Sequence, residues 1–170
     1  MTRTRSEALL LGEWACLGLL YRTPQHGFAV AARLRPDADI GRVWSLSRPL
    51  TYRALDQLQT RGLVHAVGEE PGVAGGPRTL LAATRTGRAA LRQWTRTPVE
   101  HLRELRSELL LKLVLAAECG LDVSDLLVAQ RERVAKLVQA LSVPTGCSDP
   151  VALWRYEAAT AAARFLDRIH

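Results

Sequence analysis

The stretch WSLSRPLTYRALDQLQTRGLV, residues 44–64, decides the fold because it predicts one short helix with a sharp start and a sharp end. Ser47 can cap this helix, and Pro49 lies in its first turn, where a missing N–H costs nothing. Gly62 ends it. The front of the helix carries polar and charged side chains that packing does not require, and we expect them to be exposed: Ser47, Arg48, Thr51, Tyr52 and Arg53.

The segments around this helix are also short. Residues 6–22 predict a helix that is apolar around much of its circumference, so we expect its own domain to cover one side and a second chain the other. Residues 27–34 predict a second helix, which Pro36 stops. After residue 62, two β-prone runs flank a glycine-rich tip and predict a two-stranded ribbon. Thr84 then caps a fourth helix that ends before Pro98.

Three helices followed by a β-ribbon is the order of a winged helix-turn-helix domain. In that architecture the third helix enters the DNA major groove, which is wide enough for an α-helix. Arginine can pair with guanine, the threonine methyl can touch thymine, and tyrosine can bond to phosphate. Arg78 follows the narrow tip of the ribbon, where it can contact a minor groove or a flanking phosphate.

The second half of the chain predicts three helices and no strands. They cover residues 99–119, 122–141 and 150–169, and the last carries an apolar stripe that includes Trp154 and Phe165. Lys112 lies within an apolar run, where we expect it to extend towards water or to pair with Glu108. The fold class is therefore mainly α: a winged-helix domain over residues 1–97 and a helical dimerisation domain over residues 98–170.

The composition and the charge distribution limit the classes of function that the protein can have. Residues 1–99 carry 14 arginines and 7 acidic residues, whereas the basic and acidic residues of 100–170 nearly balance. This distribution suggests that the first half binds a polyanion. The alternative is a merely solvated basic surface. The three cysteines are far apart and form no metal-ligand pattern, which favours idle thiols in a reducing cytoplasm. We find no catalytic constellation, no cofactor motif, no secretory signal and no span long enough for a membrane.

Several motifs together resemble the PadR family of bacterial transcriptional regulators. The segment LLGEWACLGLLYRTPQHGFAVAARL resembles that family's first two helices, including the step at His26, Gly27 and Phe28. The opening stretch resembles its recognition helix, and GGPRTLLAATRTGRAALRQW resembles its wing and fourth helix. The segment RSELLLKLVLA is similar to the start of the C-terminal region of longer members. The motif residues of the recognition helix, the wing and the fourth helix are Tyr52, Leu55, Leu58, Gly62, Leu63, Pro77, Arg78, Thr84, Gly87 and Arg88.

The resemblance implies a cytoplasmic, homodimeric repressor that reads a palindromic operator in double-stranded DNA. It also implies a planar aromatic effector in the dimer interior near Trp14 and Trp94, although these rings equally suit core or dimer packing. Two departures stand out. Thr79, Leu80 and Leu81 replace the lysine and aromatic residues that usually follow the wing arginine, and Arg48-Pro49 replaces a common Pro-Gly pair, so base preference does not carry over.

Two alternatives remain open. One is a winged-helix module that binds a protein and no DNA. The other is a small-molecule-binding protein, or an enzyme that uses a cavity between helices. Arg3 and Arg5 form either a loose basic arm or an ordinary chain terminus.

Overall fold

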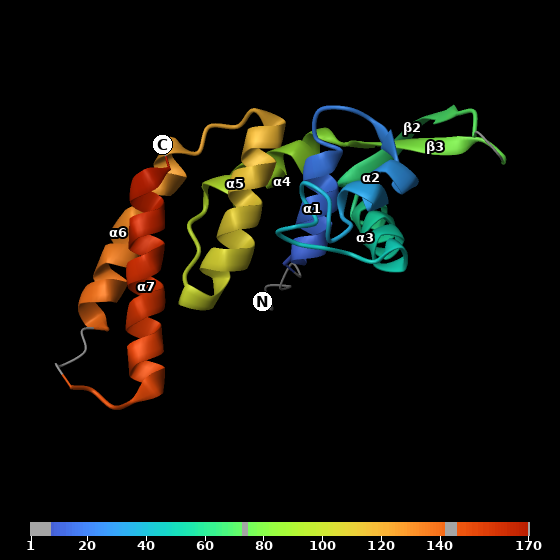
Figure 1. The fold of residues 1–170 in the computed structure, drawn as a ribbon. Coiled ribbons are helices and arrows are strands. Elements are labelled where there is room, and N and C mark those ends of the chain that lie inside the picture. The colour runs from blue at the N-terminus through green and yellow to red at the C-terminus, as the bar shows by residue number, and fades with distance from the viewer. Residues whose placement is uncertain (1–7, 73–74, 142–145, 170) are drawn as a thin grey trace, which may run out of the picture.

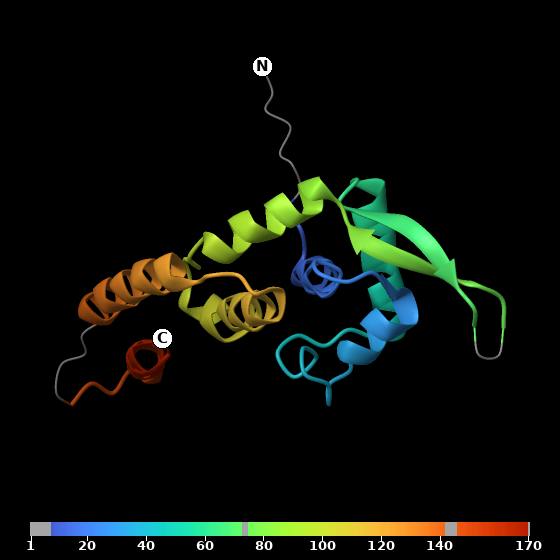
Figure 2. The same ribbon diagram turned by 90° about the horizontal axis from the view of Figure 1, so that it is seen from above.

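The computed structural model describes residues 8–72, 75–141 and 146–169 and shows an elongated molecule (Figure 1). Three helices and a small sheet form one end, and a pair of long helices forms the other. Two further helices lie between these ends. Two strands of the sheet project from the end that holds the first three helices, away from the pair of long helices (Figure 2). The basic arm expected at Arg3 and Arg5 lies outside the described residues.

The first three helices are α1 (Leu11–Leu19), α2 (Gly27–Arg33) and α3 (Arg48–Thr60). Ser47 caps α3 as expected, because its Oγ accepts the Leu50 N–H at 3.4 Å. Gly62 follows α3 with a φ of +68°, a left-handed conformation that favours glycine. α1 is shorter than expected: it starts only at Leu11, where the Glu13 carboxylate accepts the preceding N–H of Leu10 at 2.8 Å.

The sheet has three strands rather than the two that the sequence predicts. They are β1 (Gln25–His26), β2 (Val64–Glu70) and β3 (Arg78–Ala83), antiparallel in the order β1-β3-β2. The extra strand pairs Gln25 with Leu81 and His26 with Leu80, and it ties the start of α2 to the base of the wing. The expected ribbon is the β2–β3 pair, which has a bulge between Ala66 and Gly68.

The helix α4 (Arg85–Arg96) leads from the sheet towards the other end of the molecule (Figure 2). Thr84 caps it as predicted, since its Oγ1 accepts the Gly87 N–H at 3.0 Å and itself donates to the carbonyl of Gly62 at 2.8 Å. A Cβ on Gly87 would lie 2.1 Å from the Leu63 carbonyl oxygen. The start of α4 therefore packs directly on the exit of α3.

The first helix of the second half is not the single α-helix from residue 99 that the sequence predicts. Residues 99–101 are not helical: the amide of Gln130 bonds to both backbone groups of Val99, and the Glu104 carboxylate accepts the N–H groups of Glu100 and His101. A 3-10 turn, a π-helical turn and an α-helix follow: η1 (Leu102–Glu104), η2 (Leu105–Leu109) and α5 (Leu110–Cys119). The last two helices are α6 (Ser124–Ala140) and α7 (Pro150–Arg168), and Asp149 caps α7 as expected.

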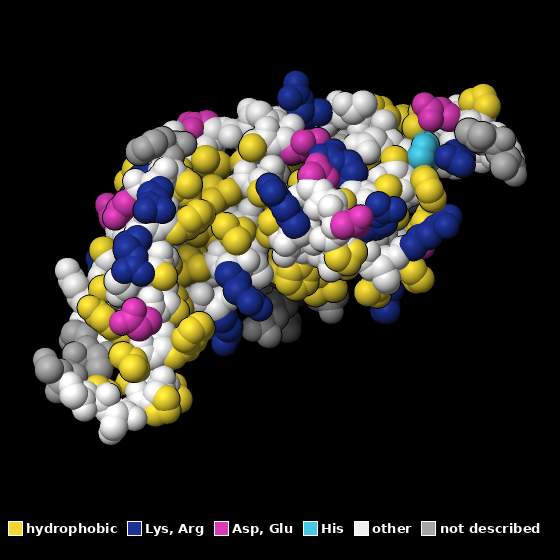
Figure 3. Space-filling view, in the orientation of Figure 1, with side chains coloured by type: hydrophobic (Ala, Val, Ile, Leu, Met, Phe, Trp, Pro, Cys, Tyr) yellow, Lys and Arg dark blue, Asp and Glu magenta, His cyan; other side chains and the backbone are white. Residues whose placement is uncertain are grey.

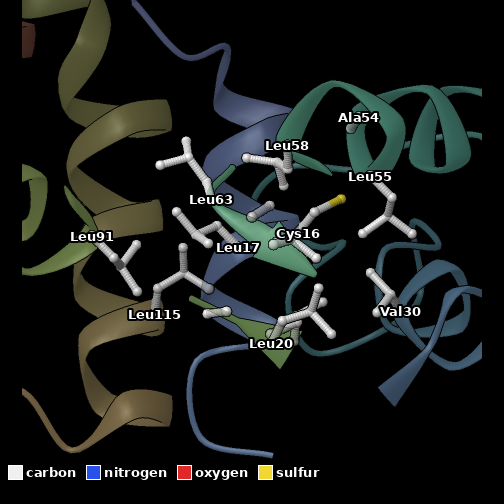
Figure 4. Packing of buried hydrophobic residues seen from close by; sticks show 14 of the residues in the cluster. Cys16, Leu17, Leu20, Val30, Ala54, Leu55, Leu58, Leu63, Leu91 and Leu115 are labelled. Carbon is white, nitrogen blue, oxygen red and sulfur yellow. The ribbon is translucent and has the colours of Figure 1, made fainter. Parts of the chain in front are cut away.

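Two apolar cores stabilise the chain. The larger core joins α1, α2, α3 and the sheet, and it also takes in Leu91 of α4 and Leu111 and Leu115 of α5 (Figure 4). The smaller core joins α6 and α7 to Val99 and Leu109. The cores are thus divided within the second half of the chain, and the boundary at residues 97 and 98 remains a prediction.

Most of the apolar surface of α1 is covered within this chain, which leaves only one edge for a second chain. α1 packs against α3 on one side and against α4 and α5 on the other. A Cβ on Gly18 would lie 2.6 Å from a Leu115 methyl carbon, so α1 and α5 approach closely at this glycine. Residues 15–20 of α1 and its C-cap are all buried.

Candidate nucleic-acid interface

The front of α3 presents most of the expected side chains to solvent. Ser47, Arg48 and Arg53 are exposed, and Tyr52 is 39% exposed. The Ser47 hydroxyl is already engaged in the helix cap. Leu50, which the sequence analysis did not single out, is 50% exposed between these polar groups. A half-exposed leucine at this point gives the surface an apolar contact as well as charge.

Thr51 is a correction, because it is completely buried. Its Oγ1 donates to the carbonyl of Ser47 at 3.1 Å, so it completes the first turn of α3 and faces away from solvent. The sequence carried a signal for this position. Thr51 precedes Ala54, Leu55 and Leu58 by three, four and seven residues, which is the spacing of one buried helix face.

Tyr52 lies against the start of α2. A Cβ on Gly27 would lie 2.8 Å from Cε1 of the Tyr52 ring. The absence of a side chain at Gly27 therefore leaves the space that the ring fills, and this explains why glycine follows His26 here. His26 in turn caps α2, since its Nδ1 accepts the Ala29 N–H at 3.0 Å.

The arginine of the wing meets the arginine of α3 at one aromatic ring. The Cζ atom of Arg48 lies 5.2 Å from the Phe28 ring centroid, and that of Arg78 lies 5.5 Å from it. These distances are typical of cation–π contacts. A hollow of about 460 Å³ lies beside them, also lined by Tyr52, Asp56 and Gln59. Phe28 was missed as a site residue, although an aromatic side chain in its position is a motif residue of the resembled family.

The charge of this surface is largely unneutralised. Within the described ranges, Arg48, Arg53 and Arg78 take part in no ion pair, and Asp56 is the one carboxylate in the lining of the hollow. Figure 3 shows basic side chains over the end of the molecule that holds α2, α3 and the wing. This surface can attract an anion by charge and contact it with guanidinium, phenol and apolar groups.

Other arginines of the first half hold the fold together. Nε of Arg88 donates to the Tyr21 carbonyl at 2.9 Å, and Arg92 donates to the Tyr21 hydroxyl at 3.1 Å. The basic excess of residues 1–99 is therefore divided between structural contacts and the exposed surface of α3 and β3.

The two tryptophans expected near an effector stack on each other. The centroids of Trp14 and Trp94 are 4.7 Å apart, and their planes differ by 9°. Nζ of Lys112 lies 5.0 Å from the Trp94 ring centroid. The expected pairing of Lys112 with Glu108 is confirmed at 2.7 Å, whereas extension into water is wrong because Lys112 is 1% exposed. Burial lowers the pKa of Lys112, and Glu108 opposes this shift.

A second hollow of about 850 Å³ lies between η1, η2, α6 and α7. It includes most of the predicted apolar stripe of α7, where Trp154 is 72% exposed and Phe165 is 38% exposed. Figure 3 shows hydrophobic side chains gathered along this part of the molecule. α7 packs into the smaller core through other residues, including Leu166, whereas Trp154, Ala161 and Phe165 of the stripe stay exposed in the described chain.

No group of three or more His, Cys, Asp or Glu side chains in the described part of the chain is placed to hold a metal ion. Among the described helices, none combines the length and the apolar character that crossing a membrane requires.

The three-helix unit, the antiparallel wing and the helical second half define a winged helix-turn-helix protein. Residues 16–93 match the sequence model described as the Transcriptional regulator PadR-like family. No curated protein matches the sequence.

Three solved structures are similar over most of their length. Bacillus subtilis PadR in complex with operator DNA has 18% identity, a TM-score of 0.49 and coverage of 91% of this chain and 95% of that one. The smu.1604c protein from Streptococcus mutans UA159 has 14% identity, a TM-score of 0.46 and coverage of 93% and 97%. The PadR-like transcriptional regulator BC1756 from Bacillus cereus has 17% identity, a TM-score of 0.44 and coverage of 97% of both chains.

Proposed function

We propose that this protein is a sequence-specific DNA-binding transcriptional regulator, and that it acts as a homodimeric repressor in the cytoplasm rather than as an enzyme. The observation that carries the proposal is the exposed, unneutralised surface formed by Arg48, Tyr52 and Arg53 of α3 with Arg78 of the wing. The match of residues 16–93 to a family of transcriptional regulators supports the same function.

In this proposal α3 lies in the major groove with its N-terminal end towards the bases. Arg48 and Arg53 contact guanine edges or phosphates, and the Tyr52 hydroxyl contacts a phosphate. The backbone N–H groups at the N-terminus of a helix also favour a phosphate nearby. Thr51 contributes no contact to DNA, because it is buried. Arg78 contacts the backbone or minor groove beside the site that α3 reads.

The homodimer is proposed to form through the helical region, residues 98–170, with residues 1–97 as the DNA-binding domain. The uncovered stripe of α7 and the hollow beside it supply the apolar surface, and in our proposal α7 packs against α1 of the partner. The edge of α1 that remains for this contact includes the half-buried Trp14. The N-cap residue of α1, Leu10, adds to this surface and is 71% exposed. Two α3 helices about 34 Å apart then read a palindrome in successive major grooves.

Release from DNA is proposed to follow binding of a planar aromatic effector at Trp14 and Trp94. The stacked pair supplies apolar ring faces, and such a ligand would have to separate the rings or cover their outer faces. Because α4 carries Trp94 and joins the two ends of the molecule, a change there alters the spacing of the two α3 helices. An effector that favours a mismatched spacing lowers the affinity for DNA.

The test is fluorescence anisotropy of the full chain with labelled duplexes, taken from upstream of its own gene and from selection out of a random library. Tight binding that resists unrelated competitor DNA, falls steeply with salt and is lost in Arg48→Ala/Tyr52→Ala supports the proposal. Arg96→Ala, an exposed arginine in the last turn of α4, is the matched control. Weak binding to any duplex that the double variant leaves unchanged contradicts the proposal and favours a protein-interaction module.

A further inference from the structure

Phe28 is a large apolar side chain that stays 47% exposed at the start of α2. The neighbouring residues Val30 and Ala31 fill the core, so packing of α2 does not depend on Phe28. A half-exposed phenylalanine gains only part of the free energy that full burial provides. Its position therefore needs another explanation.

The surroundings of Phe28 bring three elements together. Arg48 is the first residue of α3, Arg78 is the first residue of β3, and both guanidinium groups lie over the Phe28 ring at 5.2 and 5.5 Å. Arg48 also lies 5.9 Å from the Tyr52 ring centroid. In the described part of the chain, no hydrogen bond from either guanidinium is found, so ring contacts are the directional interactions that orient them.

We propose that Phe28 is a positioning residue for DNA binding, which holds the arginine of α3 and the arginine of the wing in one arrangement before DNA arrives. The inference rests on the function proposed above. Arginine has many rotamers, and ordering them on binding lowers the affinity. Two like charges near one ring also repel each other, and the negative face of the ring offsets this repulsion until phosphates replace it.

The decisive variants keep both charges and change only the ring. Phe28→Leu removes two exposed cation–π contacts, and we expect an affinity for the selected operator about 5- to 30-fold lower than wild type. Phe28→Tyr retains the aromatic face and should bind within about 2-fold of wild type. The slope of log affinity against log salt should stay the same in both, because the number of neutralised phosphates does not change. Thermal melting of each variant checks that the fold is intact.

A double-mutant cycle separates positioning from a purely structural role. In the wild-type background, the effects of Arg48→Ala and Arg78→Ala on affinity should be coupled, because both side chains share one ring. In the Phe28→Leu background the two effects should become additive. Additive effects in both backgrounds, or full affinity of Phe28→Leu, would overturn the inference while leaving the proposed function intact.

A measurement without DNA completes the test. NMR of arginine-labelled protein should show ring-current shifts on the Cδ protons of Arg48 and Arg78, and both shifts should be retained in Phe28→Tyr. In Phe28→Leu the shift of Arg78 should be lost, and that of Arg48 should become smaller because the Tyr52 ring remains beside it. Unshifted resonances in the wild type would overturn the inference even if operator binding is tight. A wild-type protein that binds no operator at any salt overturns both the proposed function and the role of Phe28.

Discussion

The packing of α4 on the exit of α3 depends on the absence of a side chain at Gly87. A Cβ there would meet the Leu63 carbonyl oxygen at 2.1 Å, a backbone atom that cannot turn aside as a side chain can. Gly87→Ala should therefore lower the free energy of unfolding by about 3 kcal/mol, the upper range of overpacking changes. Urea denaturation measures this loss.

The matched control for that glycine is Gly68→Ala, because a Cβ at Gly68 meets nothing within 4 Å. Its free energy of unfolding should stay within about 0.5 kcal/mol of wild type. Equal losses in both variants would mean that helix or strand propensity, and not the contact with Leu63, sets the effect.

Gln130 is a buried amide that links α6 to the segment between α4 and η1. Its Oε1 accepts the Val99 N–H at 2.8 Å, and its Nε2 donates to the Val99 carbonyl at 3.2 Å. Gln130→Leu leaves both backbone groups unpaired and should lower the free energy of unfolding by about 2 kcal/mol. Gln139→Leu, on the exposed side of the same helix, is the control and should have little effect.

The three thiols should differ sharply in reactivity. Burial raises the pKa of Cys16 and of Cys119 to about 12, so almost no thiolate is present at pH 8, and Cys147 is partly exposed. A disulfide-exchange reagent at pH 8 should titrate one thiol in the native protein and all three in denaturant. Rapid reaction of Cys16 or Cys119 in the native protein would show that the core around α1 and α5 opens readily.

At the scale of elements, Arg33 links α2 both to α5 and to the loop between α2 and α3. Its guanidinium forms ion pairs with Asp39 and, at 2.7 Å, with Glu118, and these contacts lower the pKa of both carboxyl groups. A carboxyl group whose pKa is lower in the folded state stabilises the fold above its unfolded pKa. This contribution is lost as the pH falls below about 4.

Arg33→Gln should consequently cost about 1 kcal/mol of unfolding free energy at pH 7, since both carboxylates are partly exposed and screened by solvent. The difference from wild type should shrink as the pH approaches about 3. Arg35→Gln is the control, because its ion pair with Asp37 is more exposed. A loss for Arg33→Gln that is constant with pH would point to packing rather than to charge.

The elements that the sequence predicted well are those with local signals. Ser47, Thr84 and Asp149 cap their helices as expected, because a cap depends on residues only a few positions away. The two-residue strand β1 had no such signal, since it depends on pairing with β3, which is distant in the chain, and the π-helical turn η2 was also not predicted. The same reason explains why the Phe28 cluster was missed, whereas the exposed arginines of α3 were expected.

The whole molecule is elongated, and α7 lies far from the wing (Figure 1). We expect Trp154→Glu to weaken the proposed dimer by at least about 10-fold, because a charge would enter the centre of its apolar surface. Light scattering after size-exclusion chromatography measures the mass, and DNA binding should lose affinity with it. Leu153→Glu, exposed but outside the hollow, is the matched control. A monomeric wild-type protein would contradict the proposed dimer.

The division of α3 into a buried and an exposed face has a consequence for change over evolutionary time. The side chains that hold α3 in place, Thr51, Leu55 and Leu58, are separate from those at its exposed front, Arg48 and Arg53. Substitutions on the exposed face therefore cost little stability, so a lineage can drift through many versions of that face while the scaffold persists. A library randomised at positions 48, 50 and 53 could in the same way be selected for new target sequences.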